Sequence, residues 1–286
     1  MGNRLRCDKA GELPVWVSLR RIVCLCAIAW GPVSFAADPA VAPVLAGGFH
    51  ERQKAASSLG RRLPPEAVGE LMDFLGVYKD ARLESSELLA LKDCICSALE
   101  NQSVYPAELP GRLTAMYRDP AHAVGWRDYC IQHLSTACRK IPADQRPAII
   151  DVFKEAVKER QSTIAGTALI ALRDNQAAVP GIRELLANHA REIAADSQSV
   201  AASRVTALQI SAGLGDKRVL PAIRMLVQDS VTERPLRLAA VAALGTLGGT
   251  EDLPVLEPLA SGSDRMFKRA AATAIAKIEA AKGDGK

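Results

Sequence analysis

Apolar residues recur at helical spacing along much of the chain, and the clearest example is the segment VLPAIRMLVQ. Its apolar positions Val219, Leu220, Ile223, Leu226 and Val227 fall on one face of a helix. Similar segments precede and follow it, as VPGIRELLA and LPVLEPLAS. The pattern therefore predicts amphipathic helices that repeat along the chain.

Prolines and glycines give this repeat its period. Pro221 and Pro254 are 33 residues apart, and so are Gly215 and Gly248. We expect each glycine to be a left-handed C-cap and each proline to lie in the first turn of the next helix, where its missing N–H costs little. Pro180 and Pro221 are 41 residues apart, and the insertion between them predicts either a surface loop or a longer helix.

The unit is therefore a helix, a tight turn and a second helix, and the chain is expected to be all-α. The expected fold is an α-solenoid of stacked antiparallel helix pairs, with about six repeats. Inner helices are expected near residues 48–60, 85–101, 121–139, 162–172, 199–213, 234–247 and 265–281. Outer helices are expected near residues 64–77, 106–117, 143–159, 177–194, 217–228 and 251–260. The solenoid is expected over 47–281, after an extended lead-in over 37–46 and before a disordered tail over 282–286.

Small side chains fill the repeat RPLRLAAVAALGTLGG, and the composition fits this: 49% of residues are hydrophobic but only 4% are aromatic. Ala239, Ala240, Ala242 and Ala243 are expected to let neighbouring helices approach closely, with Gly245 as the point of closest approach. Stacked helices favour such residues, whereas large single cores use aromatic rings to fill space.

An acidic and a basic residue recur eight positions apart around the start of the predicted inner helices. The pairs are Asp119 and Arg127, Asp196 and Arg204, and Asp229 and Arg237. Glu84 and Lys92 have the same spacing. The helix over 162–172 lacks the pair, because Lys154 and Ser162 occupy the two positions.

The segments LRLAAVAALGTLGGTEDLPVLEPLA and FKRAAATAIAKI resemble the HEAT-repeat superfamily, in particular the short bacterial HEAT-like repeats also found in phycobilin lyases. The resemblance is strong over about residues 177–280 and thin over 47–176. It implies that the acid and base positions are structural and link neighbouring repeats through a ladder of hydrogen bonds. The implied ladder residues are Asp119, Arg127, Asp196, Arg204, Asp229 and Arg237. The ladder is expected to break at the helix over 162–172.

The N-terminus has the pattern of a secretory signal peptide over residues 1–36. Five basic residues precede the apolar run IVCLCAIAW over 22–30, and small residues follow at a cleavage point after Ala36 or Ala37. A retained membrane anchor is the alternative, but Gly31 and Pro32 interrupt the run well before the 18 or more apolar residues that a span needs. The expected location is exported, either periplasmic or extracellular, with no membrane span after cleavage.

The charge balance changes once this segment is set aside. The whole chain has a formal charge of +4, but without residues 1–36 it holds 31 basic and 30 acidic residues, a net charge of +1. Overall electrostatics therefore give no case for nucleic acid or an anionic membrane as a partner. A local basic patch stays open.

Four cysteines follow the predicted cleavage point. They are Cys94, Cys96, Cys130 and Cys138. The repeat register puts Cys130 level with the residue between Cys94 and Cys96 on the neighbouring helix. A disulfide from Cys94 or Cys96 to Cys130 is therefore the expectation for an exported protein, and four buried free thiols are the alternative.

Motifs that carry chemistry are scarce in this sequence. Cys130 and His133 share a helix face and could begin a metal site, but the Cys-x-Cys spacing turns its two thiols to different faces. His50 with Glu51 is the only His-Glu pair, whereas the HEAT-like enzyme deoxyhypusine hydroxylase binds iron through several such pairs. There is no Gly-x-Ser-x-Gly, P-loop or His-Glu-x-x-His motif. We therefore expect no metal, no cofactor and no catalytic residue.

Two aromatic residues and two histidines also stand out. Trp126 and Tyr129 flank Arg127 and could stack a ligand, but Trp126 occupies a position held by Leu236 in a later repeat, so core packing is the favoured interpretation. His122 and His189 are isolated and are expected at the surface or at helix caps.

The leading functional hypothesis is an exported scaffold that binds another protein or peptide through a concave inner-helix surface, without catalysis. The basis is the extended surface that stacked repeats provide. A bilin- or small-ligand-binding lyase or chaperone is the alternative that the resemblance implies. A third hypothesis is a structural module of an envelope complex, held by a bridge from Cys94 or Cys96.

Overall fold

The computed structural model describes residues 37–178 and 180–283, and every regular element in these ranges is a helix. The signal peptide predicted over 1–36 and the last residues of the predicted tail lie outside the described residues. Within the described ranges, none of the helices has both the length and the apolar character needed to cross a bilayer.

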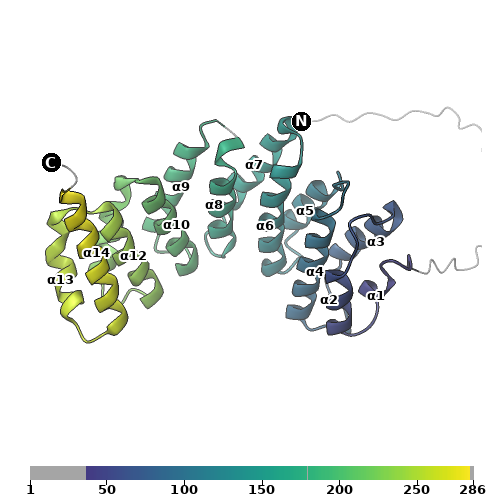
Figure 1. The fold of residues 1–286 in the computed structure, drawn as a ribbon, viewed down its shortest axis with the longest axis horizontal. Helices are drawn as coiled ribbons and strands as arrows, with labels where there is room; N and C mark the ends of the chain where they lie inside the picture. The colour runs from purple at the N-terminus through teal and green to yellow at the C-terminus, as the bar shows by residue number, and fades with distance from the viewer. Residues whose placement is uncertain (1–36, 179, 284–286) are drawn as a thin grey trace, which may run out of the picture. The chain divides into compact units, whose positions relative to one another are not determined.

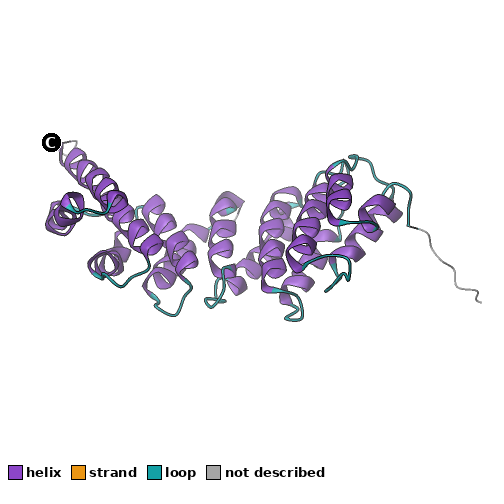
Figure 2. Cartoon of the chain, turned by 90° about the horizontal axis from the view of Figure 1, so that it is seen from below, coloured by secondary structure: helices purple, strands orange, loops and turns teal. Residues whose placement is uncertain are grey.

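The α-helices form two rows, which alternate along the chain (Figures 1 and 2). The even-numbered row contains α2 (Phe49–Ser57), α4 (Ser85–Glu100), α6 (Val124–Lys140), α8 (Ile164–Asp174), α10 (Ala201–Leu214), α12 (Arg234–Leu247) and α14 (Arg265–Gly283). The odd-numbered row contains α1 (Ala42–Leu45), α3 (Pro65–Leu75), α5 (Leu109–Arg118), α7 (Arg146–Ala156), α9 (Ile182–Ala195), α11 (Leu220–Gln228) and α13 (Leu253–Ser261). Short 3-10 helices occupy Ala143–Gln145, Gln176–Ala178, Lys217–Val219 and Thr250–Asp252.

Each even-numbered helix packs on the odd-numbered helix before it and on the next helix of its own row. This is the α-solenoid of helix pairs that the sequence predicts, and every predicted inner and outer helix corresponds to one of these α-helices. The predicted inner helices are the even-numbered row. The most extensive contacts therefore form between neighbours in the stack, as expected of a repeat protein.

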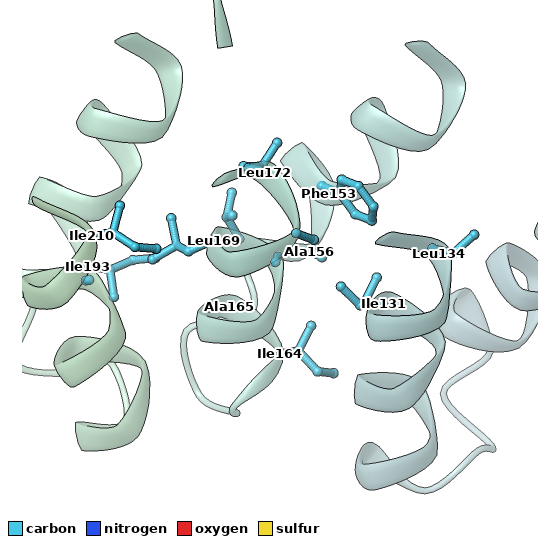
Figure 3. Close-up of a cluster of buried hydrophobic side chains, with 14 of the residues drawn as sticks. Ile131, Leu134, Phe153, Ala156, Ile164, Ala165, Leu169, Leu172, Ile193 and Ile210 are labelled. Atoms are coloured by element: carbon cyan, nitrogen blue, oxygen red, sulfur yellow. The ribbon is translucent and has the colours of Figure 1, made fainter. Parts of the chain in front are cut away.

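One apolar core lies between the rows and continues from Val41 to Ile278. Figure 3 shows its middle, where α8 directs Leu169 toward Ile193 of α9 and Ile210 of α10. All three side chains are at most 3% exposed. A helix of the even-numbered row therefore has apolar contacts on both of its flanks, and each repeat depends on the next for its burial.

Two glycines predicted as left-handed C-caps behave differently. Gly215 has φ +70°, which confirms the prediction. Gly248 has φ −73° and ψ 179°, so the prediction is wrong there. A Cβ on Gly248 would lie 2.6 Å from the Leu244 carbonyl oxygen and 2.6 Å from Asp252 Oδ2. A side chain at Gly248 would therefore clash with the preceding turn. The backbone there is not left-handed, so its conformation does not itself require glycine.

The alanine-rich helix α12 confirms the predicted close approach in part. A Cβ on Gly245 would lie 2.4 Å from the Cα of Ala274 in α14, so only glycine fits this contact. Ala240 and Ala243 are buried, whereas Ala242 is exposed. The exposed alanine leaves space above the contact between α12 and α14.

Two segments lie outside the regular repeat. The first differs from its expectation, and the second decides between two alternatives. The lead-in over 37–46 is not wholly extended, because α1 forms there with Pro43 in its first turn, where no N–H is needed. Val41 and Val44 are fully buried and anchor it to the core. The insertion before Pro221 lengthens a helix: α9 has 14 residues, whereas α11 has 9.

Candidate functional site

Three arginines of the predicted ladder cap the C-terminal ends of odd-numbered helices. Each is the fourth residue of an even-numbered helix, and its Nε donates to the carbonyl oxygen ten residues earlier. The bonds are Arg127 to Tyr117 at 2.6 Å, Arg204 to Ala194 at 3.2 Å and Arg237 to Val227 at 3.0 Å. The last carbonyls of a helix lack partners within that helix, so these side chains satisfy groups that the turn would otherwise leave open.

The three acids of the predicted ladder shape the turns instead of pairing with those arginines. Oδ1 of each accepts the backbone N–H two residues further on, with distances of 2.9 Å for Asp119, 2.9 Å for Asp196 and 3.0 Å for Asp229. Hydrogen bonds to the Asp196 and Asp229 carboxylates hold their pKa values below the usual range, chiefly those from the turn N–H groups. The two members of an implied pair therefore form a cap and a turn within one repeat. Links to neighbouring repeats also start from this set, because Arg127 reaches Glu159 Oε1 at 2.6 Å and Asp119 accepts from the Tyr78 hydroxyl at 2.6 Å.

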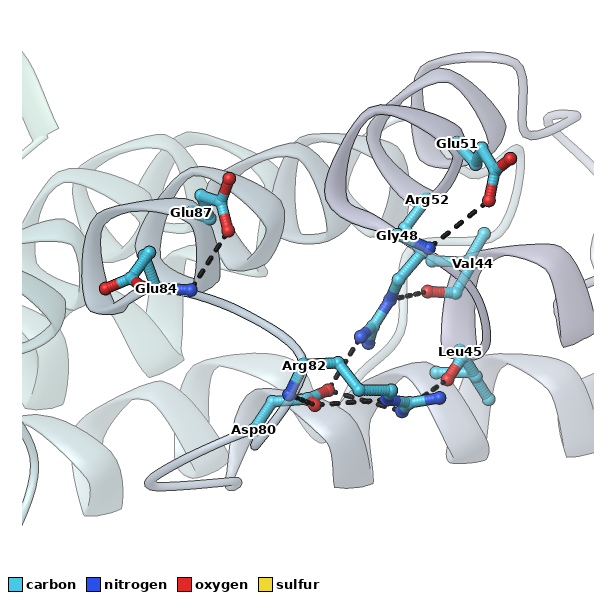
Figure 4. A network of polar contacts seen from close by, with 9 residues as sticks. All are labelled: Val44, Leu45, Gly48, Glu51, Arg52, Asp80, Arg82, Glu84 and Glu87. Carbon is cyan, nitrogen blue, oxygen red and sulfur yellow. Dashed lines mark hydrogen bonds and ion pairs between the residues drawn. The ribbon is translucent and has the colours of Figure 1, made fainter.

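Links between repeats use other partners, as Figure 4 shows for the first two repeats. Arg52 donates through Nη1 to Asp80 Oδ2 at 2.6 Å and through Nε to the Val44 carbonyl at 2.8 Å. Burial opposes ionisation of Asp80, but hydrogen bonds from Arg52 and Arg82 outweigh it and lower its pKa. The buried Arg52 thus joins its own repeat to the turn of the next.

The predicted break in the ladder coincides with α8. The fourth residue of α8 is Thr167, whose hydroxyl donates to Asp128 Oδ1 at 2.9 Å. The cation that reaches the following repeat is Arg160, at 3.4 Å from Asp196 Oδ2 and 2.8 Å from Glu192 Oε2. Arginine at the fourth helical position is therefore absent at α8, and an arginine in the preceding turn takes over the link.

The cavity beside Lys92 is one place where ionisable and aromatic side chains gather. It has a volume of about 520 Å³, and its lining includes Tyr78, Lys92, His122 and Trp126. Lys92 is 2% exposed, donates to the Val77 carbonyl and lies 4.8 Å above the Trp126 ring. Burial lowers the pKa of Lys92 to about 8.

His122 and Trp126 line this cavity in different ways from each other. His122, expected at the surface or at a helix cap, lies just before α6 and is buried, and it stacks on Tyr78 with ring centroids 4.4 Å apart. Trp126 is 1% exposed, as its predicted place in the core requires, and its Nε1 has no hydrogen-bond partner among the described residues. The Lys92 cavity therefore combines an aromatic wall with a buried amine.

His133 is held between two carboxylates of the neighbouring helix. Its Nε2 lies 3.1 Å from Asp93 Oδ1 and its Nδ1 lies 3.1 Å from Glu100 Oε1. Burial disfavours the charged ring, but the two carboxylates outweigh it and raise the pKa of His133 to about 9. Both ring nitrogens are therefore occupied, and His133 acts as an ionic link between α4 and α6.

Sequence reasoning missed this carboxylate–histidine cluster, although Asp93 and Glu100 are seven residues apart on one helix face. That spacing was the available signal. Across the described ranges, no group of three or more His, Cys, Asp or Glu residues is arranged to hold a metal ion.

All four cysteines are free thiols in the structure, so the bridge from Cys94 or Cys96 to Cys130 stays a prediction. Cys94 is half-buried, and its Sγ lies 3.9 Å from Gln53 Nε2 on α2, away from α6. Cys96 and Cys130 are fully buried, and burial and then the proximity of Cys130 raise the pKa of Cys96. The geometry thus favours Cys96 over Cys94 as the partner of Cys130.

Grooves separate several neighbouring helices of the even-numbered row. One of about 350 Å³ lies between α2 and α4, with Arg61 and Asp93 in its lining, and one of about 350 Å³ lies between α6 and α8, with Arg139 and Asp174. The third, between α12 and α14, has a volume of about 660 Å³. Its lining comprises Leu238, Ala242, Arg265, Met266, Arg269, Ala270, Thr273, Ala274 and Lys277, and we call it the α12–α14 groove.

A match to a family model supports this architecture for the last repeats. Residues 189–276, from within α9 to within α14, match the family model described as HEAT repeats. The chain folds as a HEAT-like α-solenoid. The comparison with curated proteins gave no match. Among solved structures, human deoxyhypusine hydroxylase in complex with glycerol is similar, with 17% sequence identity, a TM-score of 0.37, and coverage of 84% of this chain and 83% of that chain.

Proposed function

We propose that this protein is an exported helical-repeat scaffold that binds another protein or peptide along its even-numbered row and has no catalytic activity of its own. The observation that carries the proposal is the set of grooves between neighbouring helices of that row. Repeats present such grooves side by side, so an extended segment can contact several of them.

Two ionisable groups with perturbed pKa values, His133 and Asp80, support a structural rather than a catalytic role. His133 has both ring nitrogens bonded to carboxylates. Asp80 is bound to Arg52 and Arg82. A general acid or base must reach a substrate proton, and side chains committed in this way do not.

Cross-linking from matched positions tests the binding surface. A photo-reactive phenylalanine analogue would replace Ile170 or Thr273 on the even-numbered row, and Met225 or Glu257 on the odd-numbered row. All four positions are exposed, so each variant keeps the core. After irradiation in the native envelope fraction, we expect adducts from the even-numbered row only. Equal adducts from both rows, or none from either, would contradict the proposal.

Export is tested separately by the N-terminus of the protein recovered from its own cells. We expect a chain that begins at Ala37 or Asp38 and is found outside the cytoplasm. The domain limits proposed from the sequence are 1–36 for the signal peptide, 37–46 for the lead-in, 47–281 for the solenoid and 282–286 for the tail. A chain that begins at Met1 and fractionates with the cytoplasm would reject export but leave the binding surface untouched.

A second candidate function is small-ligand binding, and the Lys92 cavity is the specific observation that favours it. Its volume lies within the range of about 300–1,000 Å³ that is typical of small-molecule sites. Visible absorbance in the purified protein, lost on Trp126→Leu but kept on Leu236→Ile, would favour a pigment in this cavity. If mass spectrometry shows a ligand bound at full occupancy while the protein is colourless, that ligand is not a bilin.

A further inference from the structure

The last helix of the even-numbered row is strongly basic, although the predicted mature chain as a whole is nearly neutral. α14 carries five basic residues and one acidic residue, Glu279. The basic residues are Arg265, Lys268, Arg269, Lys277 and Lys282. Three of them lie in the first five residues of the helix. The Asp264 carboxylate already accepts the N–H groups of Met266 and Phe267 at this helix end, so an anion in the groove would interact favourably with the basic side chains rather than with the helix terminus.

The cations of the α12–α14 groove make almost no contacts with other polar side chains among the described residues. Among the described residues, neither Arg265 nor Arg269 makes an ion pair or a side-chain hydrogen bond, and Lys277 has one contact, 3.4 Å to the Thr246 hydroxyl. Several exposed arginines elsewhere pair with carboxylates, as Arg118 does with Glu155 at 2.7 Å, whereas Arg61 and Arg139 are exposed without an ion pair among the described residues. The described lining of the α12–α14 groove contains three cations and no carboxylate.

The opposite wall and floor of this groove are apolar. α12 contributes Leu238 and the exposed Ala242, and α14 contributes Ala270 and Met266, whose side chain is 57% exposed. The small residues open the space, because Gly245 brings the two helices together below it while Ala242 adds no bulk above. Methionine and arginine side chains are enriched at protein–protein interfaces, and the lining of this groove presents both.

We propose that the α12–α14 groove binds an acidic peptide segment, with an apolar side chain between Leu238 and Met266 and carboxylates against Arg265, Arg269 and Lys277. This inference rests on the proposed scaffold function and narrows it to one groove and one partner chemistry. Grooves α2–α4 and α6–α8 have linings of mixed charge, so they lack this preference.

A protein segment fits this groove better than a nucleic acid does. The cations lie on α14 alone, and the α12 wall offers aliphatic side chains to the ligand. The described lining has no aromatic ring on which a base could stack. Carboxylates that alternate with leucines would match both walls.

Fluorescence polarisation with the full chain tests the inference. The probe is a labelled peptide in which glutamate and leucine alternate, and the comparison probes are the same peptide with glutamine for glutamate and a single-stranded DNA oligonucleotide. We expect the acidic peptide to bind at least ~10-fold more tightly than either, because charge and apolar contact both contribute. Raising the salt concentration should weaken binding.

Charge reversal locates the site. Arg265→Glu with Arg269→Glu should weaken the acidic peptide at least ~10-fold. The matched control, Arg139→Glu with Arg173→Glu, makes the same change in net charge at exposed residues around the α6–α8 groove and should change affinity less than ~2-fold. Ala242→Trp keeps every cation but blocks the apolar wall, and should also abolish binding. Circular dichroism confirms that each variant remains folded.

Three results would overturn the inference. They are absence of acidic-peptide binding, equal losses in the test and control pairs, and retention of binding in Ala242→Trp together with equal affinity for DNA. If the peptide fails while cross-links from Ile170 and Thr273 persist, only this inference falls. If the cross-links fail as well, the scaffold function falls with it.

Discussion

The repeats from α2 to α7 and the repeats from α10 to α14 solve the same packing problem with different side chains. The five largest fully buried side chains all lie in the first part of the chain: Arg52, Lys92, Tyr117, Trp126 and Phe153. From α10 onward the seam is built from Ala207, Ala240, Ala243, Ala271 and Ala274, which are all buried. One architecture therefore tolerates either bulky, partly polar contacts or close backbone contacts.

The difference teaches where each part of the molecule can vary. The stability of the first part is expected to depend on pH and on oxidation, because the ionisable ring of His133 and the thiols of Cys96 and Cys130 lie in its core. Close backbone packing makes the second part sensitive to any added atom, as at Gly245. The close packing also leaves the α12–α14 groove open at the surface, where we propose that it binds a peptide.

Trp126→Ala gives the sharpest test of the bulky core. Removing this 1%-exposed ring should cost about 3–5 kcal/mol, since the cavity cannot collapse fully. Leu236→Ala, at the matching third position of α12, removes fewer atoms and should cost less. Urea unfolding followed by circular dichroism measures both, and amide exchange assigns the loss to helices. Equal losses would erase the distinction between the two regions.

A Cys96–Cys130 disulfide in oxidised, exported protein is the second prediction. Closing the intervening loop should stabilise the chain by about 4 kcal/mol in the chain-entropy estimate. Peptide mass mapping without reduction, with unfolding measured with and without reductant, checks it. Cys138→Ser should leave the bridge in place, whereas Cys96→Ser should remove it. Four alkylatable thiols in such material would reject the bridge.

The His133 cluster predicts a loss of stability at alkaline pH. Its folded-state pKa of about 9 exceeds the ordinary value of about 6.5. The stabilisation is therefore complete below about pH 6.5 and disappears as the pH rises through 9, with a total of roughly 2–4 kcal/mol. Unfolding midpoints between these pH values should fall in the wild type and stay flatter in His133→Gln. His50→Gln, at an exposed site, is the control that should retain the wild-type slope.

The smallest expected effect comes from one methyl group in the alanine seam. Gly245→Ala should destabilise by about 1–3 kcal/mol, because the new Cβ meets the Ala274 backbone. Gly213→Ala, with open space around its Cβ, should instead stabilise α10 by about 0.5–1 kcal/mol. Opposite signs in thermal unfolding would support close packing at Gly245, and a stabilising Gly245→Ala would refute it.

Much of the fold was open to prediction because its signals are local. Pro221 and Pro254 both lie in the first turn of their helices, as expected. Gly215 has the predicted left-handed backbone, but Gly248 does not. A glycine at a helix end is compatible with either conformation, and the crowding around Gly248 comes in part from Asp252 of the next element.

The candidate site was harder to predict from the sequence, because the groups that interact there come from different helices and repeats. Arg127, Arg204 and Arg237 could be singled out by their spacing, yet their acceptors are backbone carbonyls that leave no mark in a sequence. Arg265 and Arg269 look like ordinary surface residues until α12 is placed beside them.

By itself the sequence determined the helices, the 33-residue spacing from α10 to α12 and the all-α stack, since helical periodicity, caps and prolines act within a few residues of chain. Only the tertiary structure decided that His133 meets Asp93 and Glu100, that Cys96 rather than Cys94 approaches Cys130, and that α12 and α14 enclose a basic groove. These outcomes depend on how side chains of separate helices interlock, and the free energy of that packing is shared among residues distant in sequence.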